Sequence, residues 1–516
     1  MPSAFALSIV AIAITFVVLR IASSITHDAR EPKAVTGNIP FLSTIYGILV
    51  HKDDYYIRLR NETQLPIYTL KLPGVTLYVI NSLHLIQRID RHITTVDFAP
   101  LQAQMCKKAI CVSKDGMNRI SASENSYLRS FPRTAAPGAM PGPGLNVLGK
   151  AVVKTFTDTF DRVESQGGIT VDLFEWVRRE TFRASTNALY GPHNPFRDPK
   201  IEKAWSDYEN DLPTIFMGIF PNILARRGVK GRETMVSALM NYFQEGRHLD
   251  GSMFIQLGQK VNESFGLTLE DRARVEVGQV AAATFNTAPG AFWAVWQVLA
   301  DPVVFEDCRQ EVTRLVQNDV DGTSTIDLAR IRAECPILIS TLQEVFRFHG
   351  TSIAFRLVQE DTLIDDQYLL KKGGAVLMPN AVIHSDKSLW GPTVGEFNHK
   401  RFLKAARNES TKHPVAAFRG FGGGHILCPG RHFASTEILS LMALMLVRVD
   451  VLPVAGKWTE PKKDLVVGRA LPIPKSRLNV KIVPKPGRKW RTVYSAEDAS
   501  GVNIVAEDLL EKTSSS

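Results

Sequence analysis

Hydrophobic and polar positions follow a helical period over most of the chain. Between about Val152 and Leu315, apolar residues recur at spacings of three and four, which predicts amphipathic helices. A further helix is expected around Ile337–Phe348. Asp301-Pro302 has the residue types of a helix start, a capping carboxylate followed by a proline in the first turn. Strand and helix do not alternate as in dinucleotide-binding folds, so the pattern predicts a mainly helical protein.

Short β-prone runs stand on both sides of this helical region. Ile67–Ile80 consists of two runs rich in β-branched and aromatic residues around Pro73-Gly74, which predicts a hairpin. A second β-prone stretch covers residues 358–378 and is divided by adjacent glycines. We therefore expect small sheets beside a helical body.

The first 22 residues predict a membrane anchor. Ala4–Leu19 is almost uninterrupted apolar sequence, and Arg20 is followed by two more apolar residues. A helix of about 20 residues crosses a bilayer, so this run suffices if Arg20 extends its charge to the surface. A cleaved signal peptide is the alternative, but basic residues follow the run and none precedes it. The same charge bias predicts that the body of the protein is cytosolic.

Composition narrows the class of protein only modestly. The 516 residues carry a net charge of +9, with basic residues spread along the chain, which favours a solvated surface over a nucleic-acid site. Such a surface also suits an anionic membrane or an acidic partner. The five cysteines are odd in number and contain no CxxC pair, which argues against a disulfide scaffold and a structural zinc site.

The segment Phe418–Leu439 carries the most informative chemistry. Gly422–Gly424 allow a tight turn and the close approach of a flat ligand to the backbone. Cys428 follows, and a helical pattern begins at Arg431. A thiol just before a helix meets unpaired N–H groups and the positive end of the helix dipole, which favour the thiolate. A cysteine or a glycine turn alone would indicate nothing more than ordinary structure.

Together, Phe421, Gly424, Cys428 and Gly430 resemble the haem-binding loop of the cytochrome P-450 family, and Cys-Pro-Gly-Arg-His-Phe-Ala resembles its fungal members. The resemblance implies haem b (iron protoporphyrin IX) as the cofactor, bound by these four residues, with the Cys428 thiolate as axial ligand to the iron. Such a thiolate promotes cleavage of the O–O bond. One departure is Ile426, which stands where the family usually has an arginine or histidine for a haem propionate.

Further motifs stand where the resemblance requires them. Glu344 and Arg347 form an ExxR pair on one helix face. Arg401 lies in a segment resembling the family's later arginine motif, and the resemblance implies a Glu344–Arg347–Arg401 network that fixes the cysteine loop. Arg356 resembles the family's propionate-binding arginine. The partner of the second propionate stays unassigned.

Residues 277–299 form a long apolar helical stretch that is interrupted at Asn286, Thr287 and Pro289. The proline removes one N–H bond and would clash with the Phe285 carbonyl, which opens the helix there. A kinked core helix with locally satisfied polar groups is the alternative. The stretch resembles the family's oxygen-binding helix, in the variant found in sterol hydroxylases and prostacyclin synthase. The resemblance implies that Thr287 and Asn286 are catalytic and guide protons to bound oxygen.

The resemblance also implies positions that contact substrate. They are small or apolar, which suits a terpenoid, steroid or polyketide. These positions are Ala283, Phe285, Ser352, Ile353 and Ala354.

The resemblance therefore predicts a mainly α, cytochrome P-450 fold, a helical bundle around a haem with small β-sheets, plus an N-terminal transmembrane helix. We expect an anchor over residues 1–22, a proline-containing linker over 23–40, a catalytic domain over 41–490 and a polar tail over 491–516. The expected function is monooxygenation of a hydrophobic small molecule, in secondary-metabolite biosynthesis. Electrons would come from NADPH-cytochrome P-450 reductase at the endoplasmic reticulum membrane, with no nucleic-acid partner.

Three alternatives stay open at this point. The branch resemblance also covers a haem-dependent isomerase that needs neither O2 nor NADPH. A non-catalytic haem-binding sensor or carrier would share the cysteine loop without turnover. A membrane-tethered helical protein without haem is the third.

Overall fold

The structure, a computed structural model, describes residues 27–39, 41–122, 126–403, 414–466, 468–495, 503–505 and 508. The chain forms two compact units, each built from separate stretches of sequence. Met1–Leu101, Thr351–Gly395 and His413–Leu427 make up the first unit. Gln102–Gly350, Glu396–Lys412 and Cys428–Ser516 make up the second. The domain boundaries expected at residues 40 and 490 stay predictions.

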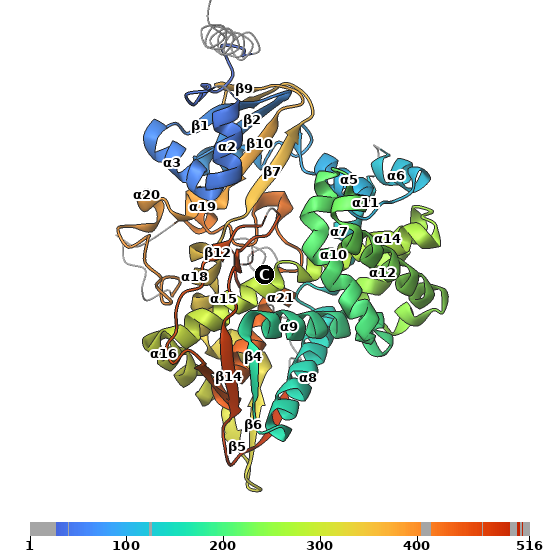
Figure 1. Cartoon of the computed structure of the whole chain (residues 1–516), viewed down its shortest axis with the longest axis vertical. Coiled ribbons are helices and arrows are strands. Elements are labelled where there is room, and N and C mark those ends of the chain that lie inside the picture. Colours follow the sequence, from blue (N-terminus) through green and yellow to red (C-terminus); the bar gives the residue numbers. More distant parts are fainter. Residues whose placement is uncertain are drawn as a thin grey trace, which may run out of the picture. The chain divides into compact units, whose positions relative to one another are not determined.

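A five-stranded sheet is the centre of the first unit. Its strands, in spatial order, are β1 (Ile67–Leu72), β2 (Val75–Ile80), β10 (Ala375–Pro379), β7 (Ile353–Val358) and β3 (Val96–Asp97). β10 runs parallel to β2 and antiparallel to β7. In Figure 1 the blue strands β1 and β2 therefore lie beside the orange strands β10 and β7, although nearly 300 residues separate them in sequence.

The predicted hairpin is confirmed at β1 and β2. Leu72 pairs with Val75, so Pro73-Gly74 alone makes the turn. Gly74 has φ 73°, a conformation that a residue without Cβ adopts most readily. Helix α3 (Asp53–Thr63) covers this hairpin and packs Tyr55, Tyr56 and Leu59 into the core of the unit. The other elements of the unit are α2 (Leu42–Tyr46), η1 (Gly47–His51), α4 (Leu83–Ile89), β8 (Thr362–Ile364), β9 (Tyr368–Leu370), α19 (Asn380–His384), α20 (Lys387–Trp390), η8 (Val415–Ala417) and η9 (Gly424–Ile426).

The second unit is mainly helical. Its α-helices are α6 (Lys114–Ser121), α7 (Tyr127–Ala135), α8 (Pro143–Ser165), α9 (Leu173–Tyr190), α10 (Pro199–Met217), α11 (Pro221–Leu224), α12 (Arg226–Gln244), α13 (Met253–Ser264), α14 (Leu269–Thr284), α15 (Thr287–Ala300), α16 (Pro302–Arg314), α17 (Ile331–Glu334), α18 (Pro336–Phe348) and α21 (Arg431–Arg448). In α21 every residue except Ala434 is buried. A helix enclosed on all sides forms the interior of its unit, and α21 begins three residues after Cys428.

Small sheets complete the second unit. Their strands form the orders β11-β14-β4, β15-β6-β5 and β12-β13. The strands are β4 (Ile169–Asp172), β5 (Val316–Asn318), β6 (Thr323–Asp327), β11 (Val449–Pro453), β12 (Lys463–Asp464), β13 (Ile473–Pro474), β14 (Asn479–Pro484) and β15 (Lys489–Val493). Helix α5 (Ala99–Lys108) begins in the first stretch of sequence and ends in the second unit.

The predicted helical body with small sheets is confirmed. Asp301 caps α16 as expected, since its carboxylate accepts hydrogen bonds from the N–H groups of Val303 and Val304. The predicted interruption of residues 277–299 is also confirmed, because α14 ends at Thr284 and α15 begins at Thr287. Within the described residues, none of the helices has the length and apolar character needed to cross a bilayer. The predicted anchor, residues 1–22, lies outside them.

Candidate functional site

Cys428 lies at the start of the most deeply buried helix of the second unit. The carbonyl of Cys428 accepts hydrogen bonds from the Arg431 backbone N–H (3.4 Å) and from Arg431 Nη1 (3.3 Å), which fixes the loop to the first turn of α21. Burial raises the pKa of the Cys428 thiol, although the Gly430 N–H and the Arg431 charge act to lower it.

This pKa direction differs from the sequence argument for Cys428. We expected the helix N-terminus to favour the thiolate, but desolvation outweighs the N–H groups and the dipole. Coordination to a metal ion deprotonates a thiol outright, so a bound iron would offset the effect of burial on this sulfur. The chemistry of this donor thus fits a metal-bound cysteine better than a free reactive one.

The structure brings together the three residues of the expected polar network. Glu344 accepts from Arg347 Nε and Nη2, both at 2.7 Å, and from Arg401 Nε at 3.1 Å to each carboxylate oxygen. The Asn398 N–H also donates to Glu344, at 2.9 Å. Glu344 is fully buried, and both guanidinium groups donate to the Glu396 carbonyl. A buried carboxylate satisfied this completely is a rigid brace within the second unit.

His399 and Lys400 stand where the family that the sequence resembles usually has proline and glutamate. They have a separate role next to this network. His399 Nε2 lies 2.7 Å and Lys400 Nζ 2.6 Å from the same carboxylate oxygen of Asp307 on α16. The substitution therefore ties the Arg401 segment to α16 and leaves the Glu344 network intact.

Arg356 shares a buried carboxylate with a second arginine in the first unit. Asp90 Oδ1 lies 3.7 Å from Arg356 Nη2, and Asp90 Oδ2 lies 3.5 Å from Arg419 Nη2. Both distances are longer than those of strong charged hydrogen bonds. Within the described residues, Arg356 Nε and the Nε and Nη2 atoms of Arg419 have no hydrogen-bond partner. Burial lowers the pKa of Arg356 to about 10. One carboxylate therefore leaves the donors of two buried guanidinium groups available for a further acid.

The glycines of the cysteine loop pack directly onto this arginine pair. A Cβ on Gly423 would lie 2.8 Å from Arg419 Nη1, and one on Gly424 would lie 2.8 Å from the Asp90 carboxyl carbon. Gly424 also has φ 60°, so a side chain there would be strained as well as obstructed. His425 Nδ1 lies 3.1 Å from the Asp90 carbonyl. Phe421 and Gly430 lie on either side of Cys428 in sequence.

Arg419 was missed by the sequence reasoning, which left the second propionate partner open. The available signal was its position immediately before the glycine loop, in Phe418-Arg419-Gly420. An isolated arginine there is compatible with solvent exposure, whereas the structure buries it to 3% exposure.

The break between α14 and α15 is held by two contacts from a distant segment. Pro289 cannot donate to the Phe285 carbonyl, and this carbonyl instead accepts a hydrogen bond from Arg469 Nη1. The Asn286 side-chain oxygen accepts from the Ala470 N–H at 2.8 Å. The Arg469 guanidinium also lies 3.9 Å above the centre of the Phe285 ring. The groups that the break exposes are therefore satisfied by residues 469–470.

Of the two residues expected to guide protons, Thr287 makes a local contact and Asn286 does not. Thr287 donates to the Ala283 carbonyl at 2.7 Å, which leaves the lone pairs of its hydroxyl oxygen as acceptors. The Asn286 amide nitrogen makes no hydrogen bond to any described residue. The Thr287 contact corresponds to the local satisfaction considered as the alternative, whereas Asn286 is held by Ala470. The two side chains offer one acceptor and one donor at the break.

The expected substrate-contacting positions belong to both units. In the second unit, Ala283 is partly exposed at the end of α14, while Phe285 is buried beneath Arg469. In the first unit, the Ser352 hydroxyl accepts from Asn380 Nδ2 at 2.7 Å, and Ile353 and Ala354 begin β7. Phe285 therefore has a structural role, the contact with Arg469, besides the substrate contact that the resemblance implies.

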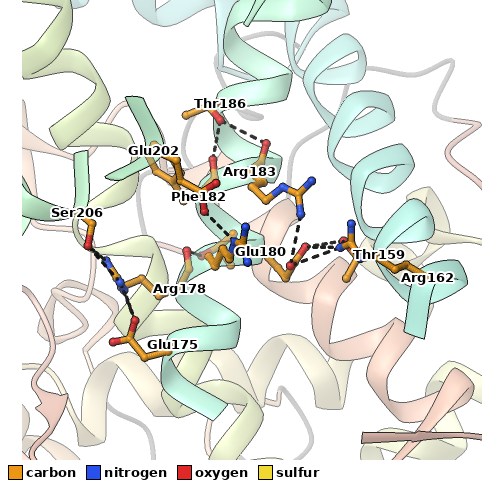
Figure 2. A network of polar contacts seen from close by, with 12 residues as sticks. Thr159, Arg162, Glu175, Arg178, Glu180, Phe182, Arg183, Thr186, Glu202 and Ser206 are labelled. Atoms are coloured by element: carbon orange, nitrogen blue, oxygen red, sulfur yellow. Dashed lines mark hydrogen bonds and ion pairs between the residues drawn. The ribbon is translucent and has the colours of Figure 1, made fainter. Parts of the chain in front are cut away.

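The ion pair at the break extends into a polar network on α9. Glu209 on α10 lies between Arg469 Nη2 (3.1 Å) and Arg178 Nη1 (3.0 Å). Figure 2 shows Arg178 directed toward Glu175 and Ser206, while Glu180 on the same helix is held by residues of α8 and by Arg183. Glu209 on α10 therefore connects the break between α14 and α15 to Arg178 on α9.

Comparison with known proteins gives consistent matches over most of the chain. The family model for cytochrome P-450 matches residues 51–480. A cytochrome P-450 monooxygenase named nodJ, from Hypoxylon pulicicidum, is 32% identical over 448 residues, covering 85% of this chain and 86% of that protein. Cholesterol 7-alpha-monooxygenase from Cricetulus griseus is 22% identical over 447 residues, covering 81% of this chain and 86% of its own length.

The arrangement of the chain also has a counterpart among solved structures. The crystal structure of the cytochrome P450DA heme domain matches with a TM-score of 0.69 and 18% identity. The match covers 89% of this chain and 99% of that one. At this level of identity the likeness concerns the fold alone.

Proposed function

Because this chain belongs to the cytochrome P-450 family, we propose that it is a monooxygenase that oxidises a hydrophobic small molecule at a haem bound through Cys428. The protein is an oxidoreductase, and its cofactor is haem with a cysteine thiolate ligand. Haem held in this way activates dioxygen, aided by electron donation from the sulfur. Cys428 is the proposed ligand because it follows the glycine-rich loop and directly precedes α21.

Two buried arginines of the first unit suit such a cofactor. Arg356 and Arg419 have buried donors that Asp90 alone does not satisfy, and a ligand with two carboxylates complements them. We infer that these two arginines bind the acid groups of the haem. Gly423 and Gly424 keep the loop backbone against the arginine pair, which orients the guanidinium groups.

The break between α14 and α15 is the observation that favours monooxygenation. Oxygen insertion requires protons to be delivered at one point, and the break offers Thr287 Oγ1 as an acceptor and Asn286 Nδ2 as a donor. The Ala283 carbonyl and the Ala470 N–H hold these two side chains in place. Asn286 Nδ2 would donate a hydrogen bond to a water, and Thr287 Oγ1 would accept one from it, so that this water could relay a proton from solvent without a carboxylic acid.

The substrate class follows from the apolar positions and from one relative. Ala283, Ile353 and Ala354 are apolar, and a relative is named cholesterol 7-alpha-monooxygenase. We therefore propose a terpenoid, steroid or polyketide substrate, in secondary-metabolite biosynthesis. The electron donor proposed is NADPH-cytochrome P-450 reductase, since the family depends on a separate redox partner.

Attachment to the endoplasmic reticulum membrane, with a cytosolic catalytic domain, is part of the proposal. The apolar run of residues 1–22 supports it. Exposed apolar side chains also gather around α11 in the second unit, where Phe220 is 72% and Ile223 75% exposed. An exposed apolar cluster of this kind is typical of a surface that contacts lipid or protein.

The test is turnover in a reconstituted system of this protein and a NADPH-dependent flavoprotein reductase. We expect NADPH and O2 consumption with terpenoid or steroid candidates, and incorporation of one labelled oxygen atom from labelled O2 into the product. Product formation without NADPH and O2 would instead establish the isomerase alternative. A substrate that changes the haem spin state but yields no product would indicate a carrier.

A matched pair of variants tests the residues at the break. Thr284 and Thr287 both donate to the carbonyl four residues earlier, at 2.8 and 2.7 Å. Thr287→Val should lower the product formed per NADPH, because protons are no longer delivered at the correct point. Thr284→Val removes an equivalent hydrogen bond within α14 and should leave this ratio unchanged. Equal effects of the two substitutions would contradict the role assigned to Thr287.

A further inference from the structure

The C-terminal tail contributes a buried carboxylate to the helix that follows Cys428. Asp508 Oδ1 accepts a hydrogen bond from Arg431 Nε at 2.7 Å and lies 3.3 Å from His432 Nε2. The side chains of Arg431 and His432 are almost completely buried, as is Asp508 itself. Asp508 lies 77 residues after Arg431, so the tail returns to the beginning of α21.

The conformation of the tail is suited to holding this carboxylate. Asp508 Oδ2 accepts from the N–H groups of Ile504 (2.8 Å) and Val505 (3.1 Å). Burial raises the pKa of Asp508, but the hydrogen bond and charge of His432 and the two N–H groups outweigh it and lower the pKa to about 2. The carboxylate is therefore ionised at any physiological pH, opposite two buried basic side chains.

The tail is also attached to the helix that carries the buried polar network. The Ile504 carbonyl accepts a hydrogen bond from Gln343 Nε2 on α18, at 2.9 Å. Gln343 directly precedes Glu344, and Ile504 is fully buried. Residues 503–505 and 508, which we call the C-terminal clasp, thus join α18 to α21 within the second unit.

One of the residues that the clasp holds contacts Cys428 directly. Arg431 donates through Nε to Asp508 and through Nη1 to the Cys428 carbonyl. With Nε engaged, the planar guanidinium has one orientation in which Nη1 faces that carbonyl. Without Asp508, Arg431 and His432 would be adjacent buried groups lacking their carboxylate, which is costly, and both would tend to move.

We propose that the C-terminal clasp supports the haem-thiolate centre and that Asp508 is a positioning residue, acting on Cys428 through Arg431. The inference depends on the proposed function in one respect, the assignment of Cys428 as the iron ligand. Residues that orient a metal ligand typically alter metal affinity or activity by about 10–100-fold when they are changed. A loosened Cys428 loop should hold its sulfur less firmly, and the bond to the iron should weaken.

The experiment compares three variants of the full-length holoenzyme. Asp508→Asn removes the charge at nearly constant shape, whereas Asp508→Glu keeps it. Glu276→Gln is the matched control, because Glu276 is another buried carboxylate of the second unit whose partner is the Tyr190 hydroxyl, at 2.7 Å. Two properties are measured: the rate at which the reduced carbon monoxide complex loses its thiolate absorption band on mild warming, and the haem reduction potential.

Asp508→Asn should lose the band roughly tenfold faster than the unaltered protein, at the lower end of such effects. Its reduction potential should rise, because a negative charge beside Arg431, the residue that contacts Cys428, has been removed. Asp508→Glu should remain near the unaltered rate, and Glu276→Gln should change neither property. If Asp508→Asn does not accumulate in folded form, Gln343→Leu is the deciding variant, because it removes the hydrogen bond that ties Ile504 to α18 and should also accelerate loss of the band.

An unchanged rate and potential in Asp508→Asn would overturn the proposal. Equal acceleration in Asp508→Asn and Glu276→Gln would also overturn it, because both changes would then act through general stability. Cys428→Ala is measured in parallel to separate the two inferences. If Cys428→Ala keeps the thiolate band, the ligand assignment fails; if it loses the band while Asp508→Asn does not respond, only the clasp fails.

Discussion

Replacement of Arg469 by methionine is expected to destabilise the protein at the break between α14 and α15. Arg469 is 7% exposed, donates to the Phe285 carbonyl and pairs with Glu209 at 3.1 Å. Methionine keeps an unbranched apolar stem over the Phe285 ring, so the substitution removes mainly the charge and the donors. The Phe285 carbonyl, to which Pro289 cannot donate, then loses its hydrogen bond from Arg469.

The magnitude follows from these contacts. Loss of a hydrogen bond from a charged group costs about 1.5–3 kcal/mol, and breaking a buried ion pair costs about 3–5 kcal/mol. Glu209 keeps Arg178 as a partner at 3.0 Å, so the lower ends of both ranges apply, and they overlap because one side chain makes both contacts. We therefore expect a loss of about 3 kcal/mol. For 516 residues the unfolding entropy is roughly 1 kcal/mol per kelvin, so Tm should fall by roughly 3 °C.

The assay combines thermal unfolding of the holoenzyme with the product formed per NADPH. Coupling should fall together with stability, because Ala470 follows Arg469 and holds the Asn286 side chain. Arg309→Met is the control, since Arg309 is 48% exposed and only 4.0 Å from Glu306 in a surface pair. If Arg469→Met and Arg309→Met had the same Tm and the same coupling, the structural role assigned to Arg469 would be refuted.

Three further substitutions have defined outcomes. Burial raises the pKa of Glu437 from 4.5 to about 8 despite hydrogen bonding from Ser185, so the folded state holds the neutral acid and loses stability as pH rises from 4.5 to about 8. Glu437→Gln should abolish this decline, so its stability difference from the unaltered protein should be constant in acid, change between pH 4.5 and 8 in favour of the variant, and be constant again above pH 8; a difference independent of pH would contradict this assignment. Glu344→Gln should lower the free energy of unfolding by about 3 kcal/mol, and with it the folded yield and Tm, because Arg347 and Arg401 lose their shared charge; an unchanged Tm would contradict the brace. Arg356→Leu combined with Arg419→Leu should weaken haem retention in a transfer assay to apomyoglobin more than either single change, and equal loss in single and double variants would argue against a shared acid-binding role.

Local sequence patterns predicted the elements whose causes are themselves local. The Pro73-Gly74 turn, the Asp301 cap and the interruption before Thr287 each depend on residues within one or two turns of each other. The Glu344–Arg347 pair is local as well, because a spacing of three residues places both side chains on one helix face. Such features could be predicted without knowledge of the rest of the fold.

Long-range partners could not be predicted in this way. Arg469 meets Phe285 across 184 residues, and Asp508 meets Arg431 across 77. In sequence each is a charged residue in a polar-looking segment, which is typical of a solvent-exposed position. Only the fold shows that both are buried and that their charges are compensated. The same reason explains why the pKa of the Cys428 thiol was expected to fall, because helix ends are visible in sequence whereas desolvation is not.

The central claim is that the sulfur of Cys428 is bonded to haem iron, and spectroscopy of a single variant tests it most directly. The reduced carbon monoxide complex of the purified protein should show the red-shifted absorption band of a thiolate ligand. Cys428→Ala should lack this band, or lack haem, while Cys335→Ala, which alters a buried cysteine elsewhere in the second unit, should retain it. Retention of the band in Cys428→Ala would contradict the account.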